Sequence, residues 1–263
     1  MMPHPVVIKI GGALLDDEKA ARQLMTRIKT LQQHRAVIVV HGGGPMVETM
    51  MTGMGLTSEK VDGLRVTPDA HMPVICGALA GSANKQLCAL AIGAGITPTG
   101  LSLMDGNMLT CQAIASELGA VGKATPNSSV LLELLIGEQF LPVISSIGCS
   151  KNGRLLNINA DQAATAVAQL MGAELLFLSN VEGVLDEHGQ RLATLDKAQL
   201  ASLVQTGVIT DGMKVKTDAA LQAALQLKRP VFIGSWHTDP EALLNATTGT
   251  KIQPEATQAG DNS

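Results

Sequence analysis

The chain has 263 residues, of which 46% are hydrophobic, 16% are charged and 2% are aromatic, and its formal net charge is −4. This length and composition predict a sizeable core in one large domain or two fused lobes, and the acidic balance with few aromatic side chains excludes a general nucleic-acid binder. No apolar run is long enough to span a membrane, no secretory signal precedes Lys9, and the four cysteines are widely spaced, so we expect a cytoplasmic protein without a zinc site or disulfide framework.

The first half of the chain reads as apolar strands that alternate with amphipathic helices. In chain order the predicted elements are a strand at 6–10, a helix at 16–33, a strand at 36–40, a helix at 45–54, a hairpin or extended loop at 56–66 and a helix from 67 to about 91. Thr67 is predicted to cap the last helix, because Pro68 follows at its first position and an acidic residue stands in its first turn.

The second half continues this alternation after a stretch of short strands. Its predicted elements are short strands with an antiparallel edge at 96–125, a helix at 128–137, a strand at 141–145, a hairpin turn at Asn152-Gly153, a short strand and a helix that ends at Gly172, a strand at 174–179, a polar loop at 186–191, helices at 195–206 and 211–227, and a strand at 230–234. The alternation predicts an α/β fold, an open three-layer αβα sandwich with a mostly parallel central sheet. A boundary near Gly172 would divide it into two lobes, 1–172 and 173–252, followed by a frayed tail at 253–263.

Polar side chains crowd the point where a short strand ends and an Ala-rich helix begins. This segment contains two amides and one carboxylate, at Asn157, Asn159 and Asp161. The helix after them would pack without these groups, so their presence indicates a site. The amides suit the binding of a small polar ligand and Asp161 suits the organisation of charged partners, although Asn159 could simply cap the helix.

Glycine-rich turns follow the first two predicted strands. Lys9 interrupts the first strand just before Gly11 and Gly12, at the carboxyl end, which faces the ligand crevice in such sheets. The turn His41-Gly-Gly-Gly-Pro45 ends the second strand, and its N–H groups and the helix start after it form an anion site, although it is neither a Walker A nor a dinucleotide loop. For Lys9 the alternative is a lysine that reaches solvent, and for the glycine run it is a simple tight turn. His41 is expected to be a structural hydrogen-bonding group.

Further cations stand near two other helix starts. Arg65, in Asp62-Gly-Leu-Arg-Val-Thr67, could bind a carboxylate through two hydrogen bonds. Lys214 and Lys216 follow Thr210 and face different directions, so at most one points into a site. Solvated surface positions are the alternative for all three cations. Because the chain has no recognisable Ser-His-Asp or Cys-His motif, this set suits electrostatic handling of phosphates rather than covalent catalysis.

Taken in order, these motifs resemble the amino-acid kinase family over almost the whole chain. The resemblance rests on Val7-Ile-Lys-Ile-Gly-Gly12, HGGGP, DGLRVT, GALAGSANK, PVISSIG, NINADQAATA and ITDGMKVK. It implies in-line transfer of the γ-phosphoryl group of ATP to the γ-carboxylate of N-acetyl-L-glutamate, as in arginine biosynthesis, without a covalent enzyme intermediate. It also implies Mg²⁺ held mainly by the nucleotide, and no nucleic-acid or membrane partner. A sister kinase for another carboxylate or carbamate, and a non-catalytic ligand sensor on the same fold, are the alternatives.

The resemblance also implies a role for each matching residue. The first lobe would bind the acyl amino acid and form the dimer, and the second would bind ATP. Lys9 and Lys216 would stabilise the transferring phosphoryl group, and Asp161 would hold both ammonium groups in place. The acceptor would bind to Gly43, Gly44, Arg65 and Asn157. The nucleotide and its phosphates would lie against Gly11, Gly12, Asn180, Val181, Glu182, Gly183, Val184, Leu185, Val208, Ile209 and Thr210.

Three features depart from the usual pattern of the family. Asn180 stands where many members carry Asp, and Lys214 stands where an apolar residue is common. Eight residues precede Lys9, whereas members that arginine inhibits carry a longer N-terminal helix that joins dimers into hexamers. The resemblance therefore implies an arginine-insensitive homodimer, with the helix from Pro68 to about Ala91 as the expected contact.

Overall fold

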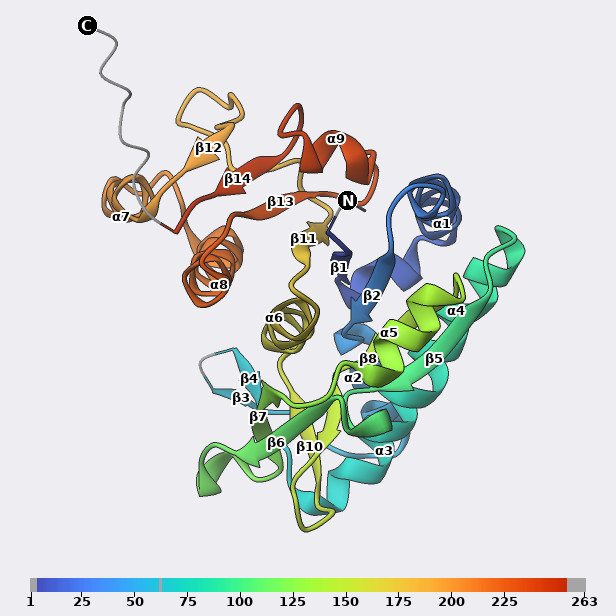
Figure 1. Ribbon diagram of the computed structural model, residues 1–263. Coiled ribbons are helices and arrows are strands. Elements are labelled where there is room, and N and C mark those ends of the chain that lie inside the picture. Colours follow the sequence, from blue (N-terminus) through green and yellow to red (C-terminus); the bar gives the residue numbers. More distant parts are fainter. Residues whose placement is uncertain (1–3, 62, 255–263) are drawn as a thin grey trace, which may run out of the picture.

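A computed structural model describes residues 4–61 and 63–254 (Figure 1). Its centre is an eight-stranded sheet, in which β13–β14 is antiparallel and the other described pairings are parallel. In spatial order the strands are β12 (Thr194–Leu195), β14 (Thr250–Ile252), β13 (Val231–Ser235), β11 (Glu174–Ser179), β1 (Val6–Ile10), β2 (Val37–His41), β8 (Leu141–Ser145) and β5 (Pro98–Ser102). The predicted mostly parallel sheet is confirmed.

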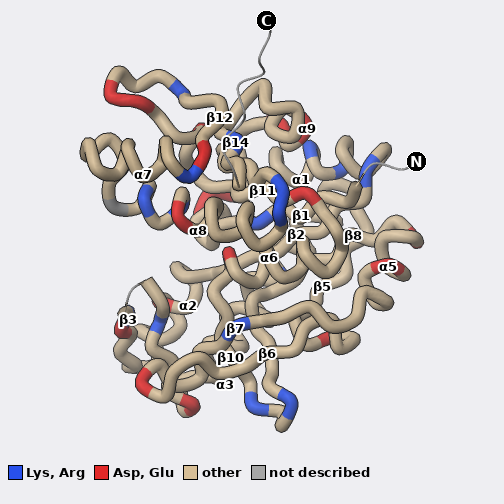
Figure 2. The backbone as a smooth tube through the Cα atoms, turned by 60° about the vertical axis from the view of Figure 1, so that its left-hand side comes forward, with Lys and Arg blue, Asp and Glu red and all other residues tan. Residues whose placement is uncertain are grey.

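Helices cover both faces of this sheet and complete the predicted three-layer sandwich (Figure 1). One face packs against α1 (Glu18–Gln32), α4 (Asn84–Gly93) and α9 (Pro240–Leu244), and the other packs against α6 (Ala160–Met171) and α8 (Asp211–Leu227). The remaining helices are α2 (Gly44–Gly53), α3 (Met72–Cys76), α5 (Val130–Gly137) and α7 (Lys197–Gln205). Basic and acidic residues are interspersed along the described backbone (Figure 2), in keeping with the small net charge.

Side-chain caps explain where several helices begin. Asp17 accepts a hydrogen bond from the N–H of Ala20 at the start of α1, and Asp196 forms a reciprocal capping box with Gln199 at the start of α7. Each cap satisfies N–H groups that a helix start leaves without a partner. At α8 the N-cap position falls on Thr210, whose side chain makes no capping hydrogen bond.

The alternation of buried residues along β1 assigns each side chain to one face of the sheet. Val6, Ile8 and Ile10 belong to the hydrophobic cluster around α1 and α4, whereas Val7 belongs to the cluster around α6 and α8. Successive side chains of a strand point to opposite faces. Lys9 therefore shares the face of Val7 and lies on the α6 side of the sheet.

Two smaller sheets lie beside the sandwich. A four-stranded sheet contains β6 (Leu109–Ala113), β7 (Val121–Pro126), β10 (Leu155–Ile158) and β9 (Ile147–Cys149), and a hairpin contains β3 (Lys60–Val61) and β4 (Leu64–Arg65). The predicted turn at Asn152-Gly153 joins the antiparallel strands β9 and β10, with Gly153 at a φ of 82°. The antiparallel edge expected within 96–125 is present as β6 and β7, but β5 joins the large parallel sheet instead.

The helix expected from Thr67 to about Ala91 is helical but not uniform. A 3₁₀ turn at Asp69–His71 leads into α3, and a π-helical segment at Gly77–Ala83 joins α3 to α4. The prediction that Thr67 caps this helix is wrong, because Thr67 is extended and pairs with Gly119, and its hydroxyl donates to the carbonyl of Arg65.

The stretch Asp69–Gly93 is long and apolar enough to cross a membrane by length and composition, with a mean hydropathy of 1.2 in its most apolar window. A helix packed inside an α/β protein passes the same test. Here α4 packs against α1, β5 and β8, so its buried apolar side chains have partners within the fold. The hydropathy of this helix is therefore weak evidence for a membrane span.

The predicted boundary near Gly172 falls between strands of one continuous sheet, because β1 pairs with β11 along its full length. The division into lobes stays a prediction. Asp62 and most of the tail expected at 253–263, namely residues 255–263, lie outside the described residues.

Candidate active site

An ion pair joins the end of β1 to the start of α6. Lys9 Nζ lies 2.8 Å from Asp161 Oδ1, and the two side chains are 17% and 25% exposed. The strand pleat brings Lys9 to the α6 face, and Asp161 stands in the first turn of α6. Both charges are therefore fixed by regular secondary structure at the carboxyl end of the central strand.

Asn159 is the N-cap of α6. Its Oδ1 accepts hydrogen bonds from the N–H groups of Asp161 and Gln162, at 2.9 and 3.2 Å. This confirms the capping interpretation for Asn159. Because the cap fixes the first turn of the helix, it also fixes the place from which Asp161 reaches Lys9.

Lys216 brings a second cation within electrostatic range of this pair. It lies half-buried on α8, which packs against α6, whereas Lys214 is exposed. Burial lowers the pKa of Lys216, the charge of Lys9 lowers it further, and Asp161 raises it. Lys216 thus interacts electrostatically with both members of the ion pair. This agrees with the expectation that at most one of Lys214 and Lys216 points into a site.

The two glycine-rich turns touch each other. A Cβ atom on Gly12 would lie 2.8 Å from the Cα of Gly43 and 2.9 Å from the backbone N of Gly44. The turn after β2 also returns toward β1, since the N–H of Gly42 donates to the carbonyl of Ile10. Glycine at position 12 therefore permits a backbone contact between the turns that follow β1 and β2.

We expect Gly12→Ala to destabilise the fold by about 1–3 kcal/mol, because the new methyl group would meet backbone atoms that cannot rotate away. Gly11→Ala is the matched control, since the nearest heavy atoms to its Cβ would be 3.9 Å away. Urea unfolding of both variants measures the difference. Equal stability of the two variants would show that the turns can separate without cost.

His41 is buried at the end of β2, where its ring contacts Asn84 at the start of α4. Its Nδ1 lies 2.8 Å from the carbonyl of Gly42, and its Nε2 lies 3.1 Å from Nδ2 of Asn84. Burial lowers the pKa of His41 to about 4, partly opposed by the hydrogen bond to Gly42. A neutral ring that donates from Nδ1 and accepts at Nε2 satisfies this geometry, so the structural role expected for His41 is confirmed.

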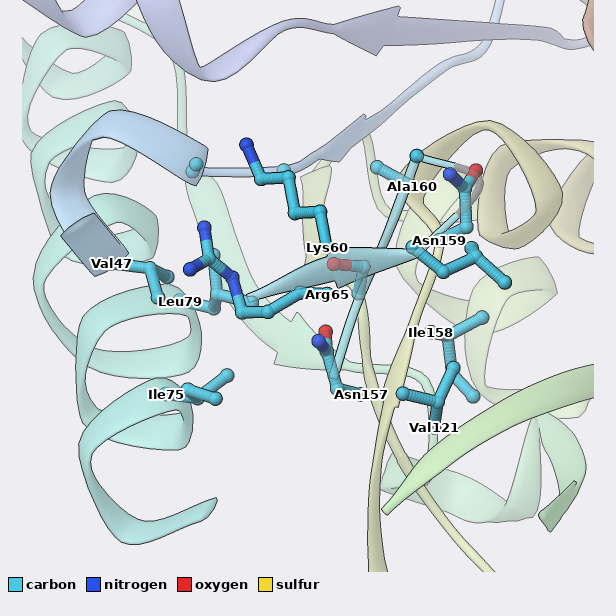
Figure 3. A pocket seen from close by; sticks show the side chains of 16 residues that line it. Val47, Lys60, Arg65, Ile75, Leu79, Val121, Asn157, Ile158, Asn159 and Ala160 are labelled. Carbon is cyan, nitrogen blue, oxygen red and sulfur yellow. The ribbon is translucent and has the colours of Figure 1, made fainter. Parts of the chain in front are cut away.

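A cavity of about 220 Å³ opens between the second glycine turn, the β3–β4 hairpin and β10 (Figure 3). All four predicted acceptor-binding residues, Gly43, Gly44, Arg65 and Asn157, line it. The full lining consists of Gly42, Gly43, Gly44, Val47, Lys60, Gly63, Leu64, Arg65, Ile75, Leu79, Val121, Ser146, Asn157, Ile158, Asn159 and Ala160. Ala160 lines the cavity and is followed directly by Asp161, so the cavity adjoins the ion pair.

The polar side chains of this cavity are held by partners that sequence reasoning missed. In Figure 3, Arg65 reaches from the hairpin toward Val47 of α2. Its guanidinium donates to Glu48 at 2.8 Å and also to the hydroxyl of Ser58. Asn157 donates from Nδ2 to the hydroxyl of Thr67 at 3.2 Å, which leaves its amide oxygen for a ligand. No local sequence pattern signals Glu48, because its partner Arg65 lies 17 residues away on another element.

Besides Gly11 and Gly12, the predicted nucleotide residues form two segments. Asn180 to Leu185 follow β11, at the edge where the N–H of Gly11 donates to the carbonyl of Leu178. Gly183 has a φ of 152° and a Cβ there would lie 2.7 Å from Thr250 Oγ1, which accepts a hydrogen bond from Val184. Val208 and Ile209 lead to Thr210 at the start of α8, which carries Lys216.

Several of these residues can offer only their backbone to a ligand. The side chains of Val184 and Ile209 are buried in the hydrophobic core, whereas Asn180, Glu182 and Thr210 are exposed. Trp236, which sequence reasoning missed, lies at the same edge of the sheet. Its ring packs near Gly11, and its backbone N–H donates to the carbonyl of Ser179.

Within residues 4–61 and 63–254, no three His, Cys, Asp or Glu side chains are grouped so that they could hold a metal ion. The ion pair offers one carboxylate, and that carboxylate already binds Lys9. The donor set therefore fits a metal that reaches the site on the phosphates of a nucleotide, and it does not form a protein cage for one.

Comparison with known proteins places this arrangement in a family. Residues 4–235 match the model of the amino acid kinase family. The chain belongs to the amino acid kinase family. This amino acid kinase is 46% identical over 259 residues to an acetylglutamate kinase of Aeromonas salmonicida (strain A449), with 98% of this chain and 100% of the relative covered. It is 49% identical over 254 residues to the acetylglutamate kinase of Serratia proteamaculans (strain 568), with 95% and 99% covered.

Solved structures share the fold of this amino acid kinase. The crystal structure of smu.665 from Streptococcus mutans UA159 has a TM-score of 0.79 and 31% sequence identity, and the match covers 95% of this chain and 98% of that one. Carbamate kinase from Giardia lamblia, bound to AMP-PNP, has a TM-score of 0.64 at 15% identity, with 96% and 99% covered, and supports the fold alone. The expected amino-acid-kinase-like sandwich and the expectation of a kinase are confirmed.

Proposed function

We propose that this kinase transfers the γ-phosphoryl group of ATP to the γ-carboxylate of N-acetyl-L-glutamate, as in the biosynthesis of arginine. The observation that carries the proposal is the cavity lined by Gly43, Gly44, Arg65 and Asn157 beside the Lys9–Asp161 pair. Relatives 46–49% identical over nearly the whole chain that are named acetylglutamate kinase support the choice of acceptor.

The acceptor would lie in the cavity with its reactive carboxylate toward the ion pair. The N–H groups of Gly43 and Gly44 would bind its anionic oxygens, Arg65 would bind its other carboxylate, and Asn157 would bind its amide portion. A carboxylate is already ionised near neutral pH and is itself the nucleophile, so the reaction needs no general base. This accounts for a site whose adjoining histidine, His41, is buried and, with its pKa lowered to about 4, neutral near neutral pH.

The chemical difficulty is the approach of two anions, and the lysines would reduce it. Lys9 would neutralise charge from the acceptor side and Lys216 from the nucleotide side, while Asp161 holds Lys9 at 2.8 Å and attracts Lys216. At an effective dielectric constant of about 20, one charge pair at about 4 Å is worth roughly 4 kcal/mol. Positioning and charge neutralisation of this size are what in-line phosphoryl transfer requires from a protein.

The nucleotide would lie along the edge formed by the segments after β11 and before α8. Its phosphates would lie against Gly11 and Gly12, and the base and sugar would lie against Asn180, Val181, Glu182, Gly183, Val184, Leu185, Val208, Ile209 and Thr210. Mg²⁺ would arrive on the phosphates and offset their charge. The proposal keeps a first lobe, 1–172, for the acceptor and the dimer contact, and a second, 173–252, for ATP.

The lowered pKa of Lys216 predicts how turnover depends on pH. A lysine whose pKa is lowered loses its proton at a lower pH than an exposed lysine, so kcat should fall on the alkaline side as the charge is lost. Lys216→Arg should remove this fall, because a guanidinium stays charged throughout. Lys214→Arg, on the exposed side of the same helix, is the matched control. An unchanged alkaline limb in Lys216→Arg would assign the titration to another group.

We further propose a cytoplasmic homodimer in which the helical stretch from Pro68 to about Ala91 forms the contact. Part of this stretch is exposed on the side away from the sheet, and Ile92 just beyond it is 65% exposed. Sedimentation should give twice the mass of the chain, and activity should be unchanged by arginine. A hexamer would contradict this assembly.

An acceptor panel tests the proposed reaction. ADP release with ATP and Mg²⁺ should be fastest with N-acetyl-L-glutamate, compared with glutamate, aspartate, an N-acetyl aminoadipate and carbamate. Faster turnover of another acceptor would make the protein a sister kinase. Binding of ATP and N-acetyl-L-glutamate without ADP release would make it a ligand sensor.

A further inference from the structure

One carboxylate ties the β3–β4 hairpin to α2 at three points. Glu48 Oε1 lies 2.8 Å from Arg65 Nη2, 3.3 Å from Ser58 Oγ and 3.7 Å from Lys60 Nζ. All three partners lie in the segment 58–65, which contains the hairpin. The described side-chain contacts of Glu48 therefore join α2 to this segment rather than to the hydrophobic core.

These contacts run beside the candidate acceptor cavity. Glu48 stands one helical turn after Gly44, where α2 begins, and both Lys60 and Arg65 line the cavity. The carboxylate thus connects the two walls that would bind the acceptor, the glycine turn and the hairpin.

The electrostatics favour an ionised Glu48 at this position. The side chain of Arg65 is only 8% exposed, so a close counter-ion is needed to stabilise its buried positive charge. The hydrogen bond from Arg65 lowers the pKa of Glu48, and the charges of Arg65 and Lys60 lower it further. Glu48 is therefore a carboxylate at neutral pH and supplies that counter-ion.

Arg65 keeps donors for a ligand while Glu48 holds it. A guanidinium has five N–H groups. The described contacts, to Glu48, to Ser58 and a 3.9 Å contact to the sulfur of Met51, use three of them. The remaining N–H groups are enough to bind a carboxylate of the acceptor, so the Glu48 contact orients Arg65 and does not block it.

We propose that Glu48 is a positioning residue that fixes Arg65 and the β3–β4 hairpin against α2 and thereby sets the affinity of the cavity for the acceptor. The inference rests on the proposed function of the cavity. Without the carboxylate, Arg65 and Lys60 lose their shared counter-ion and repel each other, and the hairpin loses its ionic attachment to α2. Binding of the acceptor then has to order the hairpin as well, which weakens binding without changing the phosphoryl-transfer step.

The test compares Glu48→Gln with Glu59→Gln. Glu59 lies in the same segment, is exposed and takes part in no described ion pair, so its variant removes the same charge without touching Arg65. Glu48→Gln should raise the KM for N-acetyl-L-glutamate about tenfold or more, the loss of one charge-assisted contact, with kcat and the KM for ATP within about threefold of wild type. Glu59→Gln should match wild type in all three constants.

Hydrogen exchange of residues 57–66 without acceptor supplies a second readout. Exchange should be faster in Glu48→Gln than in Glu59→Gln, because the hairpin opens more often. A KM within about twofold of wild type, an equal rise in both variants, or a fall in kcat alone would overturn the positioning role. If wild type does not phosphorylate N-acetyl-L-glutamate, the proposed function fails, and equal exchange in the two variants would then reject the Glu48 attachment separately.

Discussion

Replacing Lys9 by alanine is expected to lower kcat at least about a hundredfold, as loss of one preorganised electrostatic donor does in other enzymes. The ammonium group is held 2.8 Å from Asp161 at the carboxyl end of β1, beside the cavity that would hold the acceptor. Without this ammonium group, the repulsion between the acceptor and the phosphates is offset only from the nucleotide side. The KM for ATP should change little, because Lys9 acts from the acceptor side.

Lys19→Ala is the matched control for this prediction. Lys19 is an exposed residue of α1. Its variant therefore changes the net charge of the protein by the same amount but removes no group from the site. Initial rates at saturating ATP and N-acetyl-L-glutamate measure kcat of both variants. Thermal unfolding confirms that both variants are folded. A Lys9→Ala enzyme within about threefold of wild type would remove Lys9 from the mechanism, given the size of such effects.

Asp161→Asn is expected to lower kcat by about a hundredfold, because it leaves both lysines without the group that orients them, and small misplacement near the chemistry has effects of this order. The amide keeps the shape of the side chain, and Asn159 still caps α6, so stability should fall by no more than about 1 kcal/mol. Because Asp161 raises the pKa of Lys216, its removal should also move the alkaline fall of kcat to lower pH.

A double-mutant cycle separates this orienting role from an independent one. If Asp161 acts through Lys9 and Lys216, adding Asp161→Asn to Lys9→Ala should cost much less than it costs in wild type. Losses that multiply in the double variant, or an alkaline limb that stays in place in Asp161→Asn, would show that Asp161 acts on its own.

The parts of the site that sequence reasoning predicted depend on local rules. Whereas the meeting of Lys9 with Asp161 was expected from the family resemblance, the β1 pleat and the helix start after Asn159 are both readable from short segments. The same holds for the glycine turns, since carboxyl ends of parallel strands meet at one edge of a sheet. The fold class followed from the alternation of strands and helices in the same way.

The parts that were missed depend on contacts between distant segments. Glu48 and Arg65 are 17 residues apart on different elements, and no local sequence pattern predicts their pairing. The cap predicted at Thr67 failed because its backbone pairs with Gly119, a partner outside the local window. Trp236 reaches the edge beside Gly11 only because β13 lies next to β11 in the finished sheet.

Trapping of the product with hydroxylamine tests the proposed reaction most directly. Incubation with ATP, Mg²⁺, N-acetyl-L-glutamate and hydroxylamine should yield one N-acetylglutamyl hydroxamate for each ADP released, because an acyl phosphate is the species that hydroxylamine intercepts. Mass spectrometry should place the hydroxamate on the γ-carboxyl group. ADP release without hydroxamate, or a hydroxamate formed faster from another acceptor, would contradict transfer to the γ-carboxylate of N-acetyl-L-glutamate.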